Sequence, residues 1–264
     1  MALRPYFLLN LQCLIFKFMI EISNEAYLCP DGFGSANFQV IRELLNMVSD
    51  NFESWLDGAP HCLKPLIICH SPFQYPMCSE AYGRHIIFLS TEGDFWCQWV
   101  YQYAHEFCHH TIDGTLTGDN RGILWFEETI CELSSWCNIE RMIHTCAHSV
   151  NPCLRHFYPS VRNYHGSLLH EGEEKSRIFV GNHGGISNLL PSLHADALNR
   201  DMNKGIAFLL YPIFQANPCL WKIILCIGDC GRWHCLEAFL DYASRHADDS
   251  WSASLKLLRE KLLP

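Results

Sequence analysis

Basic residues are scarce in this chain of 264 residues. Lys and Arg total 19 against 28 Asp and Glu, which gives a formal net charge of −9. Lys and Arg never form a cluster longer than a pair. Nucleic acids and anionic membrane surfaces are bound through basic patches, so we expect neither as a partner.

Long uninterrupted apolar runs are also missing beyond the N-terminus, so we expect no membrane-spanning helix there. The first 20 residues, MALRPYFLLNLQCLIFKFMI, resemble a signal peptide because Arg4 precedes an apolar run. Asn10, Gln12 and Lys17 interrupt that run, and no small-residue cleavage site follows it. We therefore expect residues 1–20 to begin the fold as a strand or helix, with a signal or anchor as the alternative.

Regular cysteine spacing is absent, although the chain has 15 cysteines. A chain of this length does not need the disulfides that hold small secreted domains together. We expect mostly buried free thiols, and hence a reducing compartment such as the cytoplasm. Cys226, Cys230, His234 and Cys235 match no zinc or iron–sulfur spacing, so buried thiols are expected there rather than a second metal site.

The elements that are present alternate in type along the first half of the chain. A hydrophobic fraction of 49% with 18% charged residues is typical of a globular protein. The stretch 150–192 is rich in Pro, Gly and His and is expected to form long loops. Apolar periodicity predicts strands over 14–23, 64–70 and 84–91, and helices over 36–56, 94–114, 123–144, 194–214, 233–247 and 249–263.

These elements predict an α+β fold. Residues 1–148 are expected to form an α/β part with a small mixed sheet, and residues 149–264 a mainly helical part, either separately or as one continuous catalytic domain. Asp94 is the expected N-cap of the 94–114 helix, and Gly114 its C-terminal stop. The strand over 84–90 is expected at an edge of the sheet, where an extended peptide could pair with it.

The helix predicted over 94–114 carries His105, Glu106 and His109 in the pattern HExxH. Two histidines four residues apart lie on the same face of a helix, so their imidazoles can bind one Zn²⁺. Glu106, beside the first histidine, can reach a metal-bound water without binding the metal itself. Because the chain has 15 histidines, the pattern alone is also compatible with solvated histidines on a surface helix.

A catalytic zinc site of this type needs a third protein ligand. The compact pattern HExxHxxGxxH is excluded, because Ile112 and Thr115 occupy the positions of its glycine and its third histidine. The next predicted helix offers Glu128 instead, separated from His109 by residues 110–127, so that the chain reads HExxH-x18-E. The added glutamate favours a metal site over a purely structural helix.

The segment HEFCH…LWFEETICEL resembles the gluzincin metallopeptidases, which include the thermolysin-like enzymes and the zinc aminopeptidases. In the aminopeptidases the helix with the third ligand opens with Trp-Leu-Asn-Glu-Gly. Trp125 and Glu128 match its Trp and Glu in register, whereas its Leu, Asn and Gly are not matched. The resemblance covers residues 95–137.

The resemblance implies a zincin-like fold and a zinc metallopeptidase that acts on peptides or proteins. His105, His109 and Glu128 would hold a Zn²⁺ cofactor, and Glu106 would be the general base that passes a proton from water to the leaving amine. One alternative is a catalytically inactive zincin-like module that keeps the metal and binds peptides or proteins. Another is an interaction module without metal, in which the motif helix is purely structural.

Three neighbours of the motif residues also receive predictions. Glu127 is one residue off the required helix face and is expected either to face solvent or to support a ligand from behind. Glu132 shares a face with Glu128 and is a candidate for orienting a histidine. His110 points about 100° away from His109 on a helix and is expected to be a bystander.

The same resemblance implies a downstream Tyr or His that stabilises the oxyanion. His194 lies at about the expected distance beyond Glu128 and is favoured. Tyr211, Tyr164 and His183 are the competing candidates.

Overall fold

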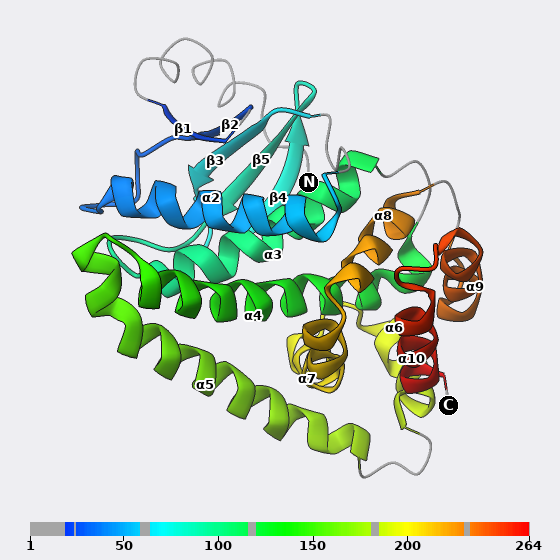
Figure 1. Cartoon of the computed structure of the whole chain (residues 1–264). Helices are drawn as coiled ribbons and strands as arrows, with labels where there is room; N and C mark the ends of the chain where they lie inside the picture. Colours follow the sequence, from blue (N-terminus) through cyan, green and yellow to red (C-terminus); the bar gives the residue numbers. More distant parts are fainter. Residues whose placement is uncertain are drawn as a thin grey trace.

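The arrangement of the chain is known from a computed structural model that describes residues 19–23, 25–58, 64–115, 120–180, 185–229 and 233–263. The described part is α+β, as predicted, with a five-stranded mixed sheet beside a larger helical region (Figure 1). Most of the N-terminal run, together with His183 and Cys230, lies outside the described residues.

The elements follow the chain in the order β1 (Ile20–Ser23), β2 (Ala26–Leu28), α2 (Phe38–Trp55), β3 (Leu66–His70), β4 (Met77–Ala81), β5 (Arg84–Leu89), α3 (Trp96–Thr115), η2 (Arg121–Ile123), α4 (Leu124–His148), α5 (Pro152–Val180), η3 (Gly185–Leu189), α6 (Leu190–Ala195), α7 (Arg200–Ala216), η4 (Pro218–Lys222), α8 (Ile223–Gly228), α9 (Leu236–His246) and α10 (Ser252–Leu262).

The strands are arranged in the order β1-β2-β3-β5-β4. Strands β2, β3 and β5 run parallel, whereas β1 and β4 are antiparallel to their neighbours. The prediction that residues 84–90 form an edge strand is wrong, because β5 lies between β3 and β4. Strand β4 is the edge strand on this side of the sheet. It joins β5 through a two-residue turn at Tyr82 and Gly83, whose φ angles of 53° and 70° suit the twist of a hairpin.

Helices α2 and α3 cover one face of this sheet (Figure 1). In β3, Leu66 and Ile68 are buried while the residues between them are partly exposed, because successive side chains of a strand point to opposite faces. Helix α2 begins where the side chain of Asn37 accepts a hydrogen bond from the Val40 backbone N–H at 3.3 Å. Asp94, the predicted N-cap of α3, instead accepts from the Asn37 backbone N–H at 2.7 Å.

The prediction of long loops over 150–192 is wrong, because most of this stretch is helix α5. Pro152 occupies the first helical position, where its missing N–H costs nothing, and the helix continues through Pro159. Leu154, Val161 and Leu168 recur every seven residues and are all buried. This helical period outweighs the Pro, Gly and His content on which the loop prediction was based.

Helix α4 lies at the centre of the helical region, between α3 on one side and α5 and α7 on the other (Figure 1). The buried hydrophobic residues form one cluster that runs from Ile22 in β1 to Leu262 in α10. Trp99 and Trp136 are fully buried within it. The two helices that carry the motif are therefore surrounded by core on several sides.

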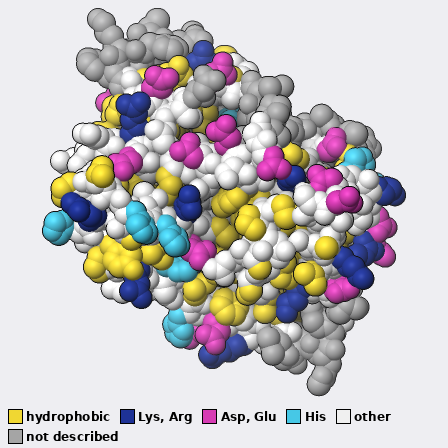
Figure 2. All heavy atoms as spheres, viewed as in Figure 1, with side chains coloured by type: hydrophobic (Ala, Val, Ile, Leu, Met, Phe, Trp, Pro, Cys, Tyr) yellow, Lys and Arg dark blue, Asp and Glu magenta, His cyan; other side chains and the backbone are white. Residues whose placement is uncertain are grey.

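Figure 2 shows hydrophobic side chains gathered towards the middle of one face, with basic, acidic and histidine side chains interspersed around them. Within the described residues no single helix has both the length and the hydropathy needed to cross a membrane. Only the pair Arg200–Ala216 and Pro218–Gly228 reaches that length and composition together, and it is bent by 118°.

Candidate metal centre

Two serines fix how α4 lies on α3. The Ser134 hydroxyl donates to the backbone carbonyl of Ala104 at 3.0 Å, and the Ser135 hydroxyl donates to that of Tyr101 at 2.8 Å. Both serines are fully buried, where an unpaired hydroxyl would be costly, so these contacts hold the two helices in one register. In that register the first turns of α4 face the middle of α3.

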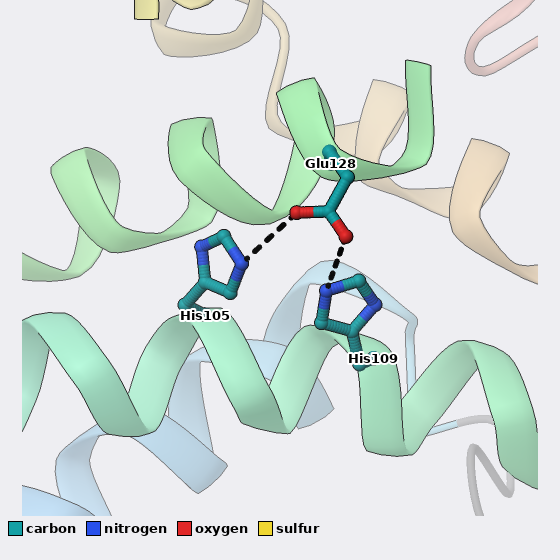
Figure 3. Close-up of side chains that lie close together, drawn as sticks. All are labelled: His105, His109 and Glu128. Carbon is teal, nitrogen blue, oxygen red and sulfur yellow. Dashed lines mark ion pairs between the residues drawn. The ribbon is translucent and has the colours of Figure 1, made fainter. Parts of the chain in front are cut away.

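His105, His109 and Glu128 come together across these two helices (Figure 3). His105 Nε2 lies 3.5 Å from one Glu128 carboxylate oxygen, and His109 Nε2 lies 3.5 Å from the other. Among the described residues this is the only group of three or more His, Cys, Asp or Glu side chains whose ligand atoms converge, all within 4.8 Å of one another.

The spacing of these atoms fits a metal ion better than a direct hydrogen bond. An N–H···O hydrogen bond spans about 2.7–3.2 Å, so 3.5 Å is too long for a good one. Ligand atoms bound to a tetrahedral zinc ion at about 2.0–2.2 Å lie about 3.4 Å apart. Two imidazole nitrogens and one carboxylate oxygen are also a donor set of catalytic zinc sites.

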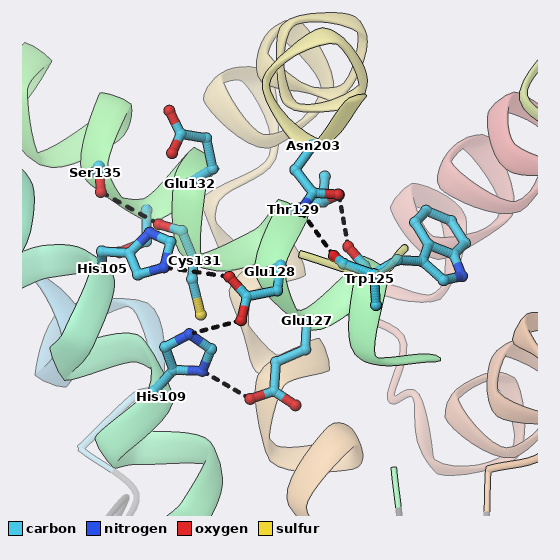
Figure 4. A network of polar contacts seen from close by, with 12 residues as sticks. His105, His109, Trp125, Glu127, Glu128, Thr129, Cys131, Glu132, Ser135 and Asn203 are labelled. Carbon is cyan, nitrogen blue, oxygen red and sulfur yellow. Dashed lines mark hydrogen bonds and ion pairs between the residues drawn. The ribbon is translucent and has the colours of Figure 1, made fainter. Parts of the chain in front are cut away.

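Glu127 supports His109 from the other side of its ring (Figure 4). His109 Nδ1 lies 2.7 Å from a Glu127 oxygen, and Asn120 donates to the second oxygen. A hydrogen on Nδ1 leaves the Nε2 lone pair directed at the cluster. Glu127 is only 3% exposed, so it does not face solvent, and its contact with His109 agrees with the alternative prediction that it supports this histidine from behind.

The charges of the cluster favour a cation. Burial lowers the pKa of His109, but the carboxylates of Glu127 and Glu128 outweigh it and raise this pKa well above its usual value. Burial raises the pKa of Glu128, but His105 and His109 outweigh it and lower that pKa below its usual range. The carboxylates that keep a proton on His109 would equally attract a divalent cation.

The hydrogen bonds of Glu132 are with Tyr101 and Trp136 and not with His105 or His109. Its carboxylate accepts hydrogen bonds from the Tyr101 hydroxyl at 2.5 Å and from the Trp136 indole N–H at 2.9 Å. His110 is buried and points away from the cluster, with its Nδ1 2.7 Å from Nδ1 of His85 on β5. Neither side chain reaches the ligand atoms.

A cleft of about 560 Å³ opens onto the cluster. Glu106, which is 4% exposed, lines it beside the two histidines and Glu128. Asp113, one turn after His109 on the same face of α3, also lines it. Burial and the Glu127 carboxylate raise the pKa of Asp113 to about 6. The i, i+4, i+8 spacing of His105, His109 and Asp113 was a sequence signal that could have identified this carboxylate.

The remaining walls come from elements far apart in the chain. Edge strand β4 contributes Met77, and the segment before it contributes Tyr75. The segment between α6 and α7 contributes Leu198, and Arg200 follows at the start of α7. Arg200 is the one Lys or Arg among the described side chains that line the cleft. Nothing in its sequence surroundings indicated this position.

The described oxyanion candidates do not line the cleft. His194 is exposed on α6. The Tyr211 hydroxyl is 3.1 Å from His165 Nε2, and the Tyr164 hydroxyl accepts a hydrogen bond from Gln98 at 3.0 Å. His183 lies outside the described residues.

The cysteine-rich stretch near α8 forms no converging group among the described residues. Cys226 is buried, as expected, but His234 and Cys235 are exposed, so the expectation of buried thiols holds for only one of the two described cysteines.

No family model, curated protein or solved structure matches the chain. The likeness of residues 95–137 to gluzincins therefore stays a resemblance of motif.

Proposed function

We propose that this protein is a zinc-dependent metallopeptidase with a zincin-like fold. His105, His109 and Glu128 would hold Zn²⁺, and the observation that carries the proposal is the convergence of their three ligand atoms, within 4.8 Å of one another, beside a cleft. When bound, zinc would lower the pKa of a coordinated water and polarise the carbonyl of a substrate.

Glu106 would move the proton in this reaction. It follows His105 directly in the chain, lines the cleft and is almost fully buried, so it can face the reacting atoms without being a ligand. As general base it would accept a proton from the attacking water and pass it to the amine of the leaving group.

Arg200 is the side chain best placed to hold negative charge on the substrate. Asn203, one turn later on α7, donates to the Ala197 carbonyl at 3.0 Å, and its amide oxygen lies 3.5 Å from the hydroxyl of Thr129 (Figure 4). These contacts anchor the start of α7 beside Glu128. A guanidinium there would stabilise an oxyanion or bind a substrate carboxylate.

The shape of the cleft suits an extended peptide. Strand β4 is an edge of the described sheet and lines the cleft through Met77, so a peptide could add to it as a further strand. Tyr75 and Leu198 are 55% and 64% exposed and provide apolar surface for substrate side chains on the cleft walls.

The test is zinc content and hydrolysis measured on the same preparations, purified without a metal-binding tag. The wild-type protein is expected to carry one zinc per chain and to cleave members of a broad peptide library. Glu128→Ala should lose the zinc. Glu106→Gln should keep it and lose hydrolysis. A wild-type protein that binds no zinc would overturn the proposal, and zinc without hydrolysis would favour the inactive peptide-binding module.

Arg200 is tested in the same assay. Arg200→Ala is expected to lower kcat/KM by about 10²-fold, as for the loss of one oxyanion-stabilising group, with zinc content unchanged. Arg177→Ala removes an exposed arginine outside the cleft lining and is the control. Equal activity of the two variants would remove Arg200 from the mechanism.

A further inference from the structure

Two cysteines lie opposite each other on the parallel strands β2 and β3. The register pairs Tyr27 with Ile67 and Leu28 with Ile68, and the Cys29 backbone N–H donates to the Ile68 carbonyl at 2.8 Å. This bond extends the register by one position and places Cys29 beside Cys69. Neighbouring strands lie about 4.8 Å apart, which falls within the Cα separations of about 4.4–6.8 Å that disulfides span.

The two side chains also point the same way. Leu28 and Ile68 are fully buried, and alternation along a strand puts Cys29 and Cys69 on the opposite face of the sheet. The two thiols are near enough to shift each other's pKa, and both residues are partly exposed. A small reagent can therefore reach two thiols that lie side by side on adjacent strands.

The pair is polarised towards nucleophilic attack by Cys29. The hydrogen bond from Cys69, assisted by one from the Asp31 backbone N–H, lowers the pKa of Cys29 to about 6 although burial opposes it. The same thiol–thiol bond and burial raise the pKa of Cys69. A thiolate next to a second thiol is the arrangement that exchanges readily with disulfides.

A second thiol pair among the described residues differs in its access to solvent. Cys108 on α3 and Cys131 on α4 also interact closely enough to raise the pKa of Cys131, but both residues are 0% exposed. Proximity is common to the two pairs. Access to a reagent distinguishes Cys29 and Cys69.

We propose that Cys29 and Cys69 form a modification site, a dithiol that low-molecular-weight disulfides such as oxidised glutathione convert to an intramolecular disulfide. The Cys29 thiolate attacks one sulfur of the reagent, whose S–S bond breaks and releases a thiolate. Cys69 then attacks the Cys29 sulfur of the mixed disulfide, and its proton goes to the second thiolate that leaves. The protein gives up two electrons, and one reagent disulfide becomes two thiols.

The experiment is peptide mapping of the full-length protein after incubation with oxidised glutathione and alkylation of the remaining thiols. The expected product is a Cys29–Cys69 disulfide that dithiothreitol reverses, with Cys108 and Cys131 recovered as alkylated thiols. Cys69→Ser should stop at a glutathionyl group on Cys29, because the second attack cannot occur. Cys29→Ser should leave Cys69 unmodified.

The result that overturns the site is recovery of Cys29 as a free thiol in the wild-type protein, or oxidation of the Cys108–Cys131 pair to the same extent. Native circular dichroism of each variant shows that a failure to react is not a failure to fold. Neither thiol belongs to the metal cluster or the cleft lining, so the outcome is independent of the proposed peptidase activity.

Discussion

At the level of single residues, three carboxylates of α4 make different contacts although they lie close together in the chain. Glu128 faces both histidines, Glu127 accepts from His109 Nδ1, and Glu132 accepts from Tyr101 and Trp136. The one-residue step from Glu127 to Glu128 turns about 100° around the helix, which moves the carboxylate from behind the imidazole to its front.

These contacts predict that two Glu→Gln substitutions in α4 affect zinc affinity differently. Glu127→Gln removes the anion behind His109 and should weaken zinc binding by about 10- to 100-fold, as is typical for partners that orient a ligand. Glu132→Gln is the matched control, since it should leave zinc affinity within a few fold of wild type. Competition with a zinc-sensitive dye measures both, and equal affinities would contradict the role of Glu127.

The buried pair of His85 and His110 predicts a dependence of stability on pH. Burial, assisted by the charge of Lys64, lowers the pKa of His85 below its unfolded value of about 6.5. Below about pH 6.5 the unfolded chain therefore binds more protons than the folded one. The free energy of unfolding is highest above that pH, where His85 is neutral in both states, and it decreases as the pH falls.

The measurement is urea unfolding of wild type and His85→Asn between pH 5 and 8. The variant should lose less stability than wild type on acidification, whatever its stability at pH 8. His156→Asn changes an exposed histidine and should keep the wild-type slope. A parallel loss in all three proteins would show that the pKa of His85 is the same in the folded and the unfolded chain.

At the level of elements, helices α5 and α7 meet closely enough to require glycine. A Cβ on Gly205 would lie 2.8 Å from the Lys175 carbonyl oxygen and 2.7 Å from the Phe179 ring. Gly205 lies in α7, whereas Gly166 lies in α5, and a Cβ on Gly166 would meet nothing within 4 Å. Glycine at position 205 permits the close packing of the two helices, whereas glycine at position 166 only lowers helix propensity.

Alanine substitutions should therefore act in opposite directions at these two positions. Gly205→Ala should destabilise the protein by about 1–3 kcal/mol, because a backbone carbonyl cannot move aside cheaply. Gly166→Ala should stabilise it by about 0.5–1 kcal/mol. Urea midpoints report both changes. Destabilisation by the Gly166 change would mean that the exposed face of α5 has a contact of its own.

At the level of the whole molecule, the metal would join two helices that lie inside one continuous buried cluster. We therefore expect a single cooperative thermal transition that zinc raises and a chelator lowers. Free zinc at about 100 times its Kd adds about 2.7 kcal/mol of stability to the folded state. Calorimetry of wild type and Glu128→Ala tests this, since the variant should unfold at the same temperature with and without zinc. Two separate wild-type transitions would indicate two independent units.

Local spacing along the sequence is enough to predict several features of this protein. The turn of a helix places His105 and His109 on one face, and the period of apolar residues predicts α2, α3, α4, α9 and α10 to within a few residues. The helix predicted over 194–214 begins six residues before α7. The distance along the chain from His109 predicts Glu128 as its partner, and the structure brings the three side chains together. The loop prediction over 150–192 is wrong because the buried apolar period of α5 outweighs its Pro, Gly and His content.

The side chains that meet the cluster from distant parts of the chain are known only from how the elements pack. The position of Arg200 depends on how Asn203 holds α7 against α4, and the role of Glu127 depends on the rotation of α4 about its own axis. Strand β4 lies at an edge because β5 pairs with β3 on one side and with β4 on the other. Each is set by packing between elements remote in sequence, which no local pattern encodes.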